Sequence, residues 1–188
     1  MHERYPVMLD GVSYDHKPEG GEIGAITRRL QRRGSCMVTA EELATAIRDG
    51  HTWMAGTFGP SERGWGPFLG LRLWALDIDN HMGKRQLVPH DAGFAWPKTI
   101  RQRLVSLGFE PILCHSTAHA TREAVRFRTV LDVGEIVTDE TEAKELIQLL
   151  LTHFPECDQS CKNPNRLSFG AQGCGMYKYF VGTDAWPS

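Results

Sequence analysis

The sequence lacks several features that would settle its class at once. It has no apolar run near the roughly 20 residues needed to span a bilayer, and its N-terminus, MHERYPVMLDG, has no signal-peptide pattern. It has no large charge excess, because 21 basic against 23 acidic residues give a net charge of −2. It has no internal repeat or low-complexity tract. A membrane-spanning protein is therefore not expected, and any nucleic-acid site must be local.

The composition is that of an ordinary globular protein, with 188 residues of which 41% are hydrophobic and 23% charged. That length predicts one domain with a well-developed core. Five cysteines without an export signal indicate the reducing cytoplasm, where clustered thiols suggest a metal rather than disulfides. The last residues, TDAWPS, show no terminating pattern, so we expect a domain taken from a longer protein.

The pattern of elements predicts an α+β fold. Residues 1–20 are polar and rich in Pro and Gly, so we expect a loosely held arm ahead of a domain over 21–188. Apolar periodicity predicts helices over 22–33, 40–49, 97–106 and 138–154. Short apolar or alternating runs predict strands over 51–58, 71–80, 111–116, 125–133, 166–170 and 176–181. Because these elements mix without βαβ repetition, we expect a mixed or antiparallel sheet with helices packed on one side.

The stretch LRLWALDIDN, residues 71–80, is an apolar run that delivers two acids at its end. In a strand, alternate residues share a face, so Asp77 and Asp79 project together while Ile78 points into the core. Neighbouring carboxylates repel each other, and Mg²⁺ or Mn²⁺ between them would relieve that repulsion. The alternative is that the strand simply ends there and its acids face water.

Three further segments complete a recognisable set: CHSTAHAT (114–121), RFRTVLD (126–132) and SCKNPNRLSFG (160–170). Together with ALDIDN (75–80), and in this order, they resemble the archaeo-eukaryotic primase superfamily. The closest resemblance is to the primase-polymerase domains of plasmid and phage replication proteins. It covers about residues 40–170.

The resemblance implies a nucleotidyltransferase, a metal-dependent DNA primase or polymerase that uses Mg²⁺ or Mn²⁺. It implies a primase-polymerase catalytic fold. Its partners would be a single-stranded DNA template, nucleoside triphosphates and a helicase domain in the full-length protein. No membrane is implied, and the location would be cytoplasmic.

The family's metal-binding motif matches Leu76 to Asp79, so Asp77 and Asp79 become the catalytic carboxylates. Its hydrophobic-Asp motif matches Leu131 and Asp132, although in many similar sequences this acid lies a little further along the chain. Its Ser-x-His motif is matched loosely, with two residues between Ser116 and His119 instead of one. The nucleotide-binding set that the resemblance implies is Ser116, His119, Arg126, Arg128, Lys162 and Arg166.

Each of these assignments has a simpler alternative. Arg126 and Arg128 lie on one strand face and would pair with Asp77 and Asp79 across a sheet without any ligand. Lys162 and Arg166 lie in a turn rich in Pro and Asn, where solvated charge is the default. His119 would be a structural histidine among small polar residues. Three other histidines, His81, His90 and His115, are interpreted as solvent-exposed or loop residues.

Two further sets have less specific patterns. A Cys₃His set would suit a structural zinc that stabilises the fold, and its members are His153, Cys157, Cys161 and Cys174. Template contact is assigned to Arg101 and Arg103 together with Trp96, although arginine on an amphipathic helix is more often a solvated face.

Two other functions stay open. A metal-dependent nuclease would use the same acids to direct water at a phosphodiester, but the arginine-rich strand suits a triphosphate better. A non-catalytic binding module of a replication initiator would bind nucleic acid without metal and without the two acids. The near-neutral net charge does not favour high nonspecific affinity.

Overall fold

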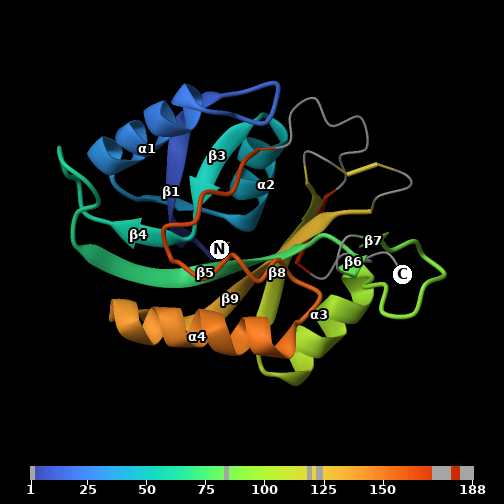
Figure 1. The fold of residues 1–188 in the computed structure, drawn as a ribbon. Coiled ribbons are helices and arrows are strands. Elements are labelled where there is room, and N and C mark those ends of the chain that lie inside the picture. The colour runs from blue at the N-terminus through green and yellow to red at the C-terminus, as the bar shows by residue number, and fades with distance from the viewer. Residues whose placement is uncertain (1–2, 83–84, 118–119, 122–124, 171–178, 183–188) are drawn as a thin grey trace.

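The computed structural model describes residues 3–82, 85–117, 120–121, 125–170 and 179–182 (Figure 1). Within these residues the α+β fold is confirmed. The helices are α1 (Gly21–Arg33), α2 (Ala40–Arg48), α3 (Pro97–Ser106) and α4 (Glu140–His153). The strands are β1 (Tyr5–Ser13), β2 (Cys36–Val38), β3 (His51–Met54), β4 (Gly56–Phe58), β5 (Phe68–Ile78), β6 (His81–Met82), β7 (Arg85–Gln86), β8 (Glu110–Ser116), β9 (Phe127–Val137) and β10 (Tyr179–Val181).

A five-stranded antiparallel sheet forms the centre, in the order β10-β8-β9-β5-β4. Its two long middle strands, β5 and β9, pair in a register that sets Asp77 opposite Arg128 and Leu73 opposite Asp132. Helix α4 packs on β5 and β9, and α3 packs on β8 and β9. Helix α4 begins at the N-cap Asp139, which accepts two backbone N–H groups, and it buries its periodic apolar face against this sheet.

A second sheet, β2-β1-β3, lies with α1 and α2 on the opposite side of the five-stranded sheet from α3 and α4 (Figure 1). The predicted capping box at Thr39 and Glu42 is present and begins α2. The expectation that the helices pack on one side is therefore wrong. The reason is that α2 has its own apolar stripe, with Leu43 and Ile47 fully buried, and it fills the space between the two sheets.

The loosely held arm expected over residues 1–20 is also wrong for residues 5–13. They form β1, the middle strand of the smaller sheet, and pair with β2 and β3. Val7 and Met8 are fully buried. The backbone N–H and C=O groups of β1 are hydrogen-bonded to strands that lie far along the chain. A prediction from the local sequence of a polar segment that contains Pro and Gly does not detect such pairing.

The segment Cys157–Gly170, which follows α4, crosses between the two sheets (orange to red in Figure 1). At its start, Cys157 forms a bridge with Ile78 of β5. Near its end, Ser168 and Trp53 of β3 exchange backbone hydrogen bonds of 2.8 and 2.9 Å. Between them, the Gly56 N–H donates to the Pro164 carbonyl at 3.1 Å. Of the strand predicted over 166–170, the structure therefore contains only an isolated β-bridge, at Ser168.

The other predicted strand near the C-terminus, 176–181, is seen as β10, and residues 176–178 lie outside the described part of the chain. Among the helices of the described residues, none is long and apolar enough to cross a membrane.

Because the crossing segment lies so close to β4, we expect Gly56→Ala to destabilise the protein. A methyl group at Gly56 would lie 2.5 Å from the Pro164 carbonyl oxygen. Overpacking of this kind costs about 1–3 kcal/mol of unfolding free energy. Urea denaturation measures the change. Gly21→Ala is the matched control, since nothing lies within 4 Å of a methyl group there, and an equal loss in both variants would contradict the prediction.

Candidate active site

The acidic end of β5 opens into a cavity of about 170 Å³. Asp77 and Asp79 both line it, as the alternation of the strand predicts, and Ile78 between them is fully buried. The next residue, Asn80, has a φ of 50°, a left-handed conformation that Asn tolerates. Its buried side chain donates to the Ala95 and Val125 carbonyls and accepts the Ala95 N–H at 2.7 Å. Asn80 therefore turns the chain directly behind the two acids.

Arg128 of β9 lies across the sheet from Asp77 and binds it with two hydrogen bonds. Its Nε donates to Oδ1 at 2.9 Å, and its Nη2 donates to Oδ2 at 2.6 Å. Both side chains are largely buried, with exposures of 10% and 15%. Burial lowers the pKa of Arg128, but the charge and hydrogen bonds of Asp77 outweigh it and raise that pKa. The ion-pair alternative is thus confirmed for this pair, whereas Arg126 instead donates to Gln86 at 3.3 Å.

A third carboxylate, Asp158, reaches the same cavity from the crossing segment. Its backbone N–H donates to the Asp77 carbonyl at 2.9 Å, which fixes it beside β5. Its side chain accepts the Ser160 N–H at 2.9 Å and lies 3.4 Å from Arg166 Nη2. Partial burial raises the pKa of Asp158, but the hydrogen bonds from Ser160 and the other contacts outweigh it and lower that pKa. Asp158 is therefore ionised at neutral pH.

Asp132, the residue predicted as the third acid, lies elsewhere. It sits opposite Leu73, four residues from Asp77 along β5, which is about 13 Å at the rise of a strand. It accepts two hydrogen bonds from Arg72, one of them from Nη2 at 2.7 Å, and another from the Gly134 N–H at 2.8 Å. The structure therefore corrects this assignment. In the sequence Asp158 follows the apolar residue Cys157. A search for a hydrophobic-Asp pair further along the chain would therefore have found it.

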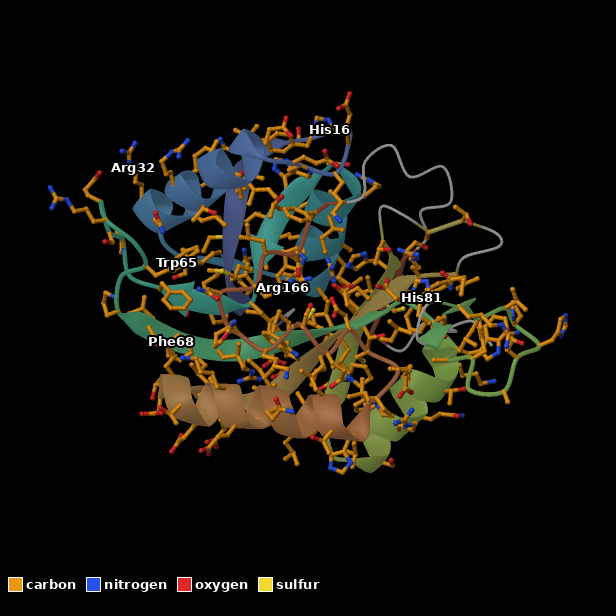
Figure 2. All side chains as sticks on the ribbon, in the orientation of Figure 1. His16, Arg32, Trp65, Phe68, His81 and Arg166 are labelled. Carbon is orange, nitrogen blue, oxygen red and sulfur yellow. The ribbon has the colours of Figure 1, made fainter. Side chains whose placement is uncertain are left out.

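The cavity collects most of the predicted cations. Arg126, Arg128 and Arg166 line it, and Lys17 from the loop after β1 joins them. Figure 2 shows Arg166 above β5, in the region where the two sheets meet. Two predicted contacts do not line it: Lys162 is exposed, and Thr117 stands in the lining where Ser116 was expected. His119 lies outside the described residues. We call this site the carboxylate cavity.

His115, which was interpreted as a solvent or loop residue, is buried in the sheet with 1% exposure. It lies on β8 opposite Arg128, and its Nδ1 is 2.9 Å from the Ser116 carbonyl oxygen. Burial, assisted by the charge of Arg128, lowers the pKa of His115 to about 4. The ring is therefore neutral at pH 7 and adds no charge behind the cavity.

The side chains predicted to hold zinc are only partly placed. His153 is exposed at the end of α4, Cys157 and Cys161 are buried, and Cys174 lies outside the described residues. Burial is the main cause that raises the pKa of Cys161 to about 12. That thiol is protonated at neutral pH, and a zinc ion would have to displace the proton. The zinc site stays a prediction.

Two of the three residues predicted to contact template, Arg103 and Trp96, make packing contacts at the ends of α3 and α4, and nothing in the structure tests template contact by Arg101. Arg103 binds Glu156 and the His153 carbonyl, and its guanidinium lies 4.5 Å from the Phe154 ring centre. These contacts join α3 to the end of α4. Trp96 is the N-cap residue of α3 and packs on Phe94 with ring centres 4.8 Å apart. For Arg103 and Trp96 the assignment is corrected as well.

Within the described ranges, no three His, Cys, Asp or Glu side chains are grouped so that they could hold a metal ion. The donor set nevertheless fits Mg²⁺, which binds through one or two carboxylates and completes its shell with water and substrate phosphates. Asp79 supplies one such carboxylate. It is half-buried, and in the part of the chain that the structure describes its carboxylate has no hydrogen-bond partner. Asp77 and Asp158 are its neighbours in the cavity.

No protein-family model, curated protein or solved structure matches this chain. The assignment of function therefore depends on the geometry of the site and on the motifs in the sequence.

We expect Asp77→Ala to lower the unfolding free energy by roughly 3–5 kcal/mol, because it leaves Arg128 buried without its partner. Asp79→Ala is the matched control and should change stability by less than about 0.5 kcal/mol. Urea denaturation of both variants measures the two effects. Equal losses, or a stable Asp77→Ala variant, would contradict a structural role for the pair.

Proposed function

We propose that this protein is a nucleotidyltransferase, a metal-dependent DNA primase or polymerase of plasmid- or phage-type replication. The supporting observation is the composition of the carboxylate cavity. It unites three acids, Asp77, Asp79 and Asp158, with four cations from distant parts of the chain. An acid cluster alone would suit many metal enzymes. Here the acids lie beside four basic side chains, those of Lys17, Arg126, Arg128 and Arg166. This combination suits a substrate that binds a metal ion and itself carries several negative charges.

The size of the cavity agrees with that substrate. About 170 Å³ is smaller than the roughly 300–1,000 Å³ of pockets that enclose whole organic ligands. The cavity would therefore hold the phosphate groups of a nucleoside triphosphate and leave the sugar and base outside. A base outside the cavity is free to pair with a template, as template-directed synthesis requires.

The acids have distinct duties in this proposal. Asp79 is the open ligand, and Asp158, which is ionised at neutral pH, is the second. Arg128 holds Asp77 in one orientation, and because it lines the cavity it would also contact an incoming phosphate. Mg²⁺ or Mn²⁺ bound there would neutralise phosphate charge and activate the attacking hydroxyl. The arginines would orient the triphosphate for in-line attack, Arg126 from the residue before β9 and Arg166 from the crossing segment.

One observation favours a second candidate, a metal-independent nucleic-acid-binding module. Asp77 is neutralised by Arg128, so its burial requires no metal. A replication initiator that only binds DNA would contain such a pair for stability alone. A nuclease has less support, because a phosphodiester carries fewer charges than the four cations of the cavity would neutralise.

The remaining parts of the proposal follow from the resemblance. The partners are a single-stranded DNA template, nucleoside triphosphates and a helicase domain of the full-length protein, and the location is the cytoplasm. The free thiols of Cys36, Cys114, Cys157 and Cys161 are consistent with that location.

The direct test is strand synthesis on a single-stranded DNA template with Mg²⁺ or Mn²⁺ and labelled triphosphates, with and without a primer. We expect product from the wild type and none from Asp77→Ala/Asp79→Ala, and the single variant Asp79→Ala, whose stability should be nearly unchanged, should also give none. Product without primer would identify a primase. Template binding by the wild type without incorporation under either metal would overturn catalysis and favour the binding module.

The corrected third acid gives a sharper test in the same assay. We expect Asp158→Asn to lower the rate by roughly a hundredfold, since it removes one of the two carboxylates proposed to hold the metal that neutralises the transferring phosphates. Asp132→Asn should keep its rate but lose stability, because Asp132 is paired with Arg72 away from the cavity. Rates are compared below the unfolding temperature of both variants. If Asp132→Asn lowered the rate more than Asp158→Asn does, Asp132 would be the third catalytic acid instead.

A further inference from the structure

A second depression, of about 390 Å³, lies beside the carboxylate cavity. Its floor is apolar, from Ile23 of α1, Leu167 and Phe169, and its rim carries Asn163, Asn165 and Arg166. We call it the amide hollow. Arg166, Leu167 and Phe169 line both the hollow and the cavity, so the two sites are contiguous. A ligand whose phosphate enters the cavity would have its neighbouring groups at the hollow.

A rigid turn presents the rim of the hollow. The Arg166 N–H donates to the Asn163 carbonyl at 3.0 Å, which closes the turn, and Pro164 occupies the second position that β-turns favour. Pro164 is buried, and its carbonyl accepts the Gly56 N–H at 3.1 Å. Because the turn is fixed from behind, binding at its outer side costs little ordering entropy.

The chemistry of the hollow matches a nucleobase. Each amide carries donors and acceptors, and within the described part of the chain the Asn163 and Asn165 side chains have no hydrogen-bond partner. A base has a flat apolar face and a polar edge, and unpaired bases in single strands are bound through both. Phe169 and Leu167 would contact the face, and the two amides the edge.

The positions of the nearby basic side chains favour a base that belongs to a strand over the base of a free nucleoside triphosphate. Lys162 is exposed immediately before the turn and Arg166 ends it, so cations stand on both sides of the amide pair. The phosphates of a strand lie on both sides of each base, whereas a free triphosphate carries its phosphates on one side. In the proposed function Lys17, Arg126, Arg128 and Arg166 face a triphosphate in the carboxylate cavity, and Arg166, which lines both sites, stands at their boundary. Lys162 lies outside that cavity and is open to a strand backbone.

We propose that the amide hollow binds an unpaired base of a single-stranded nucleic acid, with the strand backbone passing Lys162 and Arg166. This assignment rests on the proposed function in one respect, which is that the bound strand is the one read or extended at the carboxylate cavity. Lys162, predicted from sequence to contact the nucleotide, thus becomes a backbone contact.

Fluorescence anisotropy of a labelled single-stranded oligonucleotide, without metal or triphosphate, tests the hollow. Asn163→Ala/Asn165→Ala should weaken binding roughly tenfold, the scale of losing one base contact. Gln102→Ala, which removes an exposed amide from α3 on the other face of the sheet, is the matched control and should bind as the wild type. An oligonucleotide with abasic sites should bind the wild type more weakly and should not distinguish the double variant from it.

A second variant guards against loss of folding. Asn165→Asp keeps the size of the side chain but adds a negative charge. Its loss of strand binding relative to the wild type should grow as ionic strength is lowered, because repulsion between the added carboxylate and the phosphates is then less screened. Thermal melting confirms that both variants fold.

Unchanged strand binding by both hollow variants would overturn the assignment. If the same variants also raised the KM for the triphosphate, the hollow would belong to the incoming nucleotide. Failure of the proposed function looks different: no synthesis by the wild type, with base-dependent binding still lost in Asn163→Ala/Asn165→Ala, would refute nucleotidyl transfer and leave the hollow in place.

Discussion

The register between β5 and β9 is the constraint on which the site depends. It places Asp77 opposite Arg128 near the end of β5 and the start of β9, where both side chains are largely buried. A slip of one residue would turn Asp77 into the core and expose Ile78, so one register is strongly favoured. With Asp77 fixed, Asp79 follows on the same face and Asn80 turns the chain away behind it. A single cross-strand pair thus orients the acidic end of the strand.

The crossing segment supplies the other half of the site. It is attached by backbone hydrogen bonds to β5 at Asp77, to β4 at Gly56 and to β3 at Trp53. These attachments carry Asp158 and Arg166 to the cavity from a part of the chain with little regular secondary structure. Because the same segment touches both sheets, the geometry of the cavity depends on how the two sheets are held together. Stability and site geometry are therefore coupled in this protein.

Local patterns predicted what depends on local physics. Periodicity located α4, and alternation along β5 and β9 correctly set Asp77 and Arg128 on one face. The same alternation put Asp132 on that face but said nothing of its distance along the strand, and its pairing with Arg72 follows from the three-dimensional fold. β1 was missed because its pairing partners are remote in sequence. Asp158 lacked any periodic signal, since the crossing segment is held by backbone contacts rather than by an apolar stripe.

The placement of the crossing segment has a consequence for how the protein is made. Domains generally fold as units during synthesis. Asp77, Asp79 and Arg128 have all been made once the chain extends through Val137. The cavity gains Asp158, Arg166 and Phe169 only after α4 and the crossing segment have followed. Truncation before Cys157 would keep Asp77, Asp79 and Arg128 but remove Asp158, Arg166 and Phe169, so the lining of the cavity is complete only when the chain beyond α4 has been made.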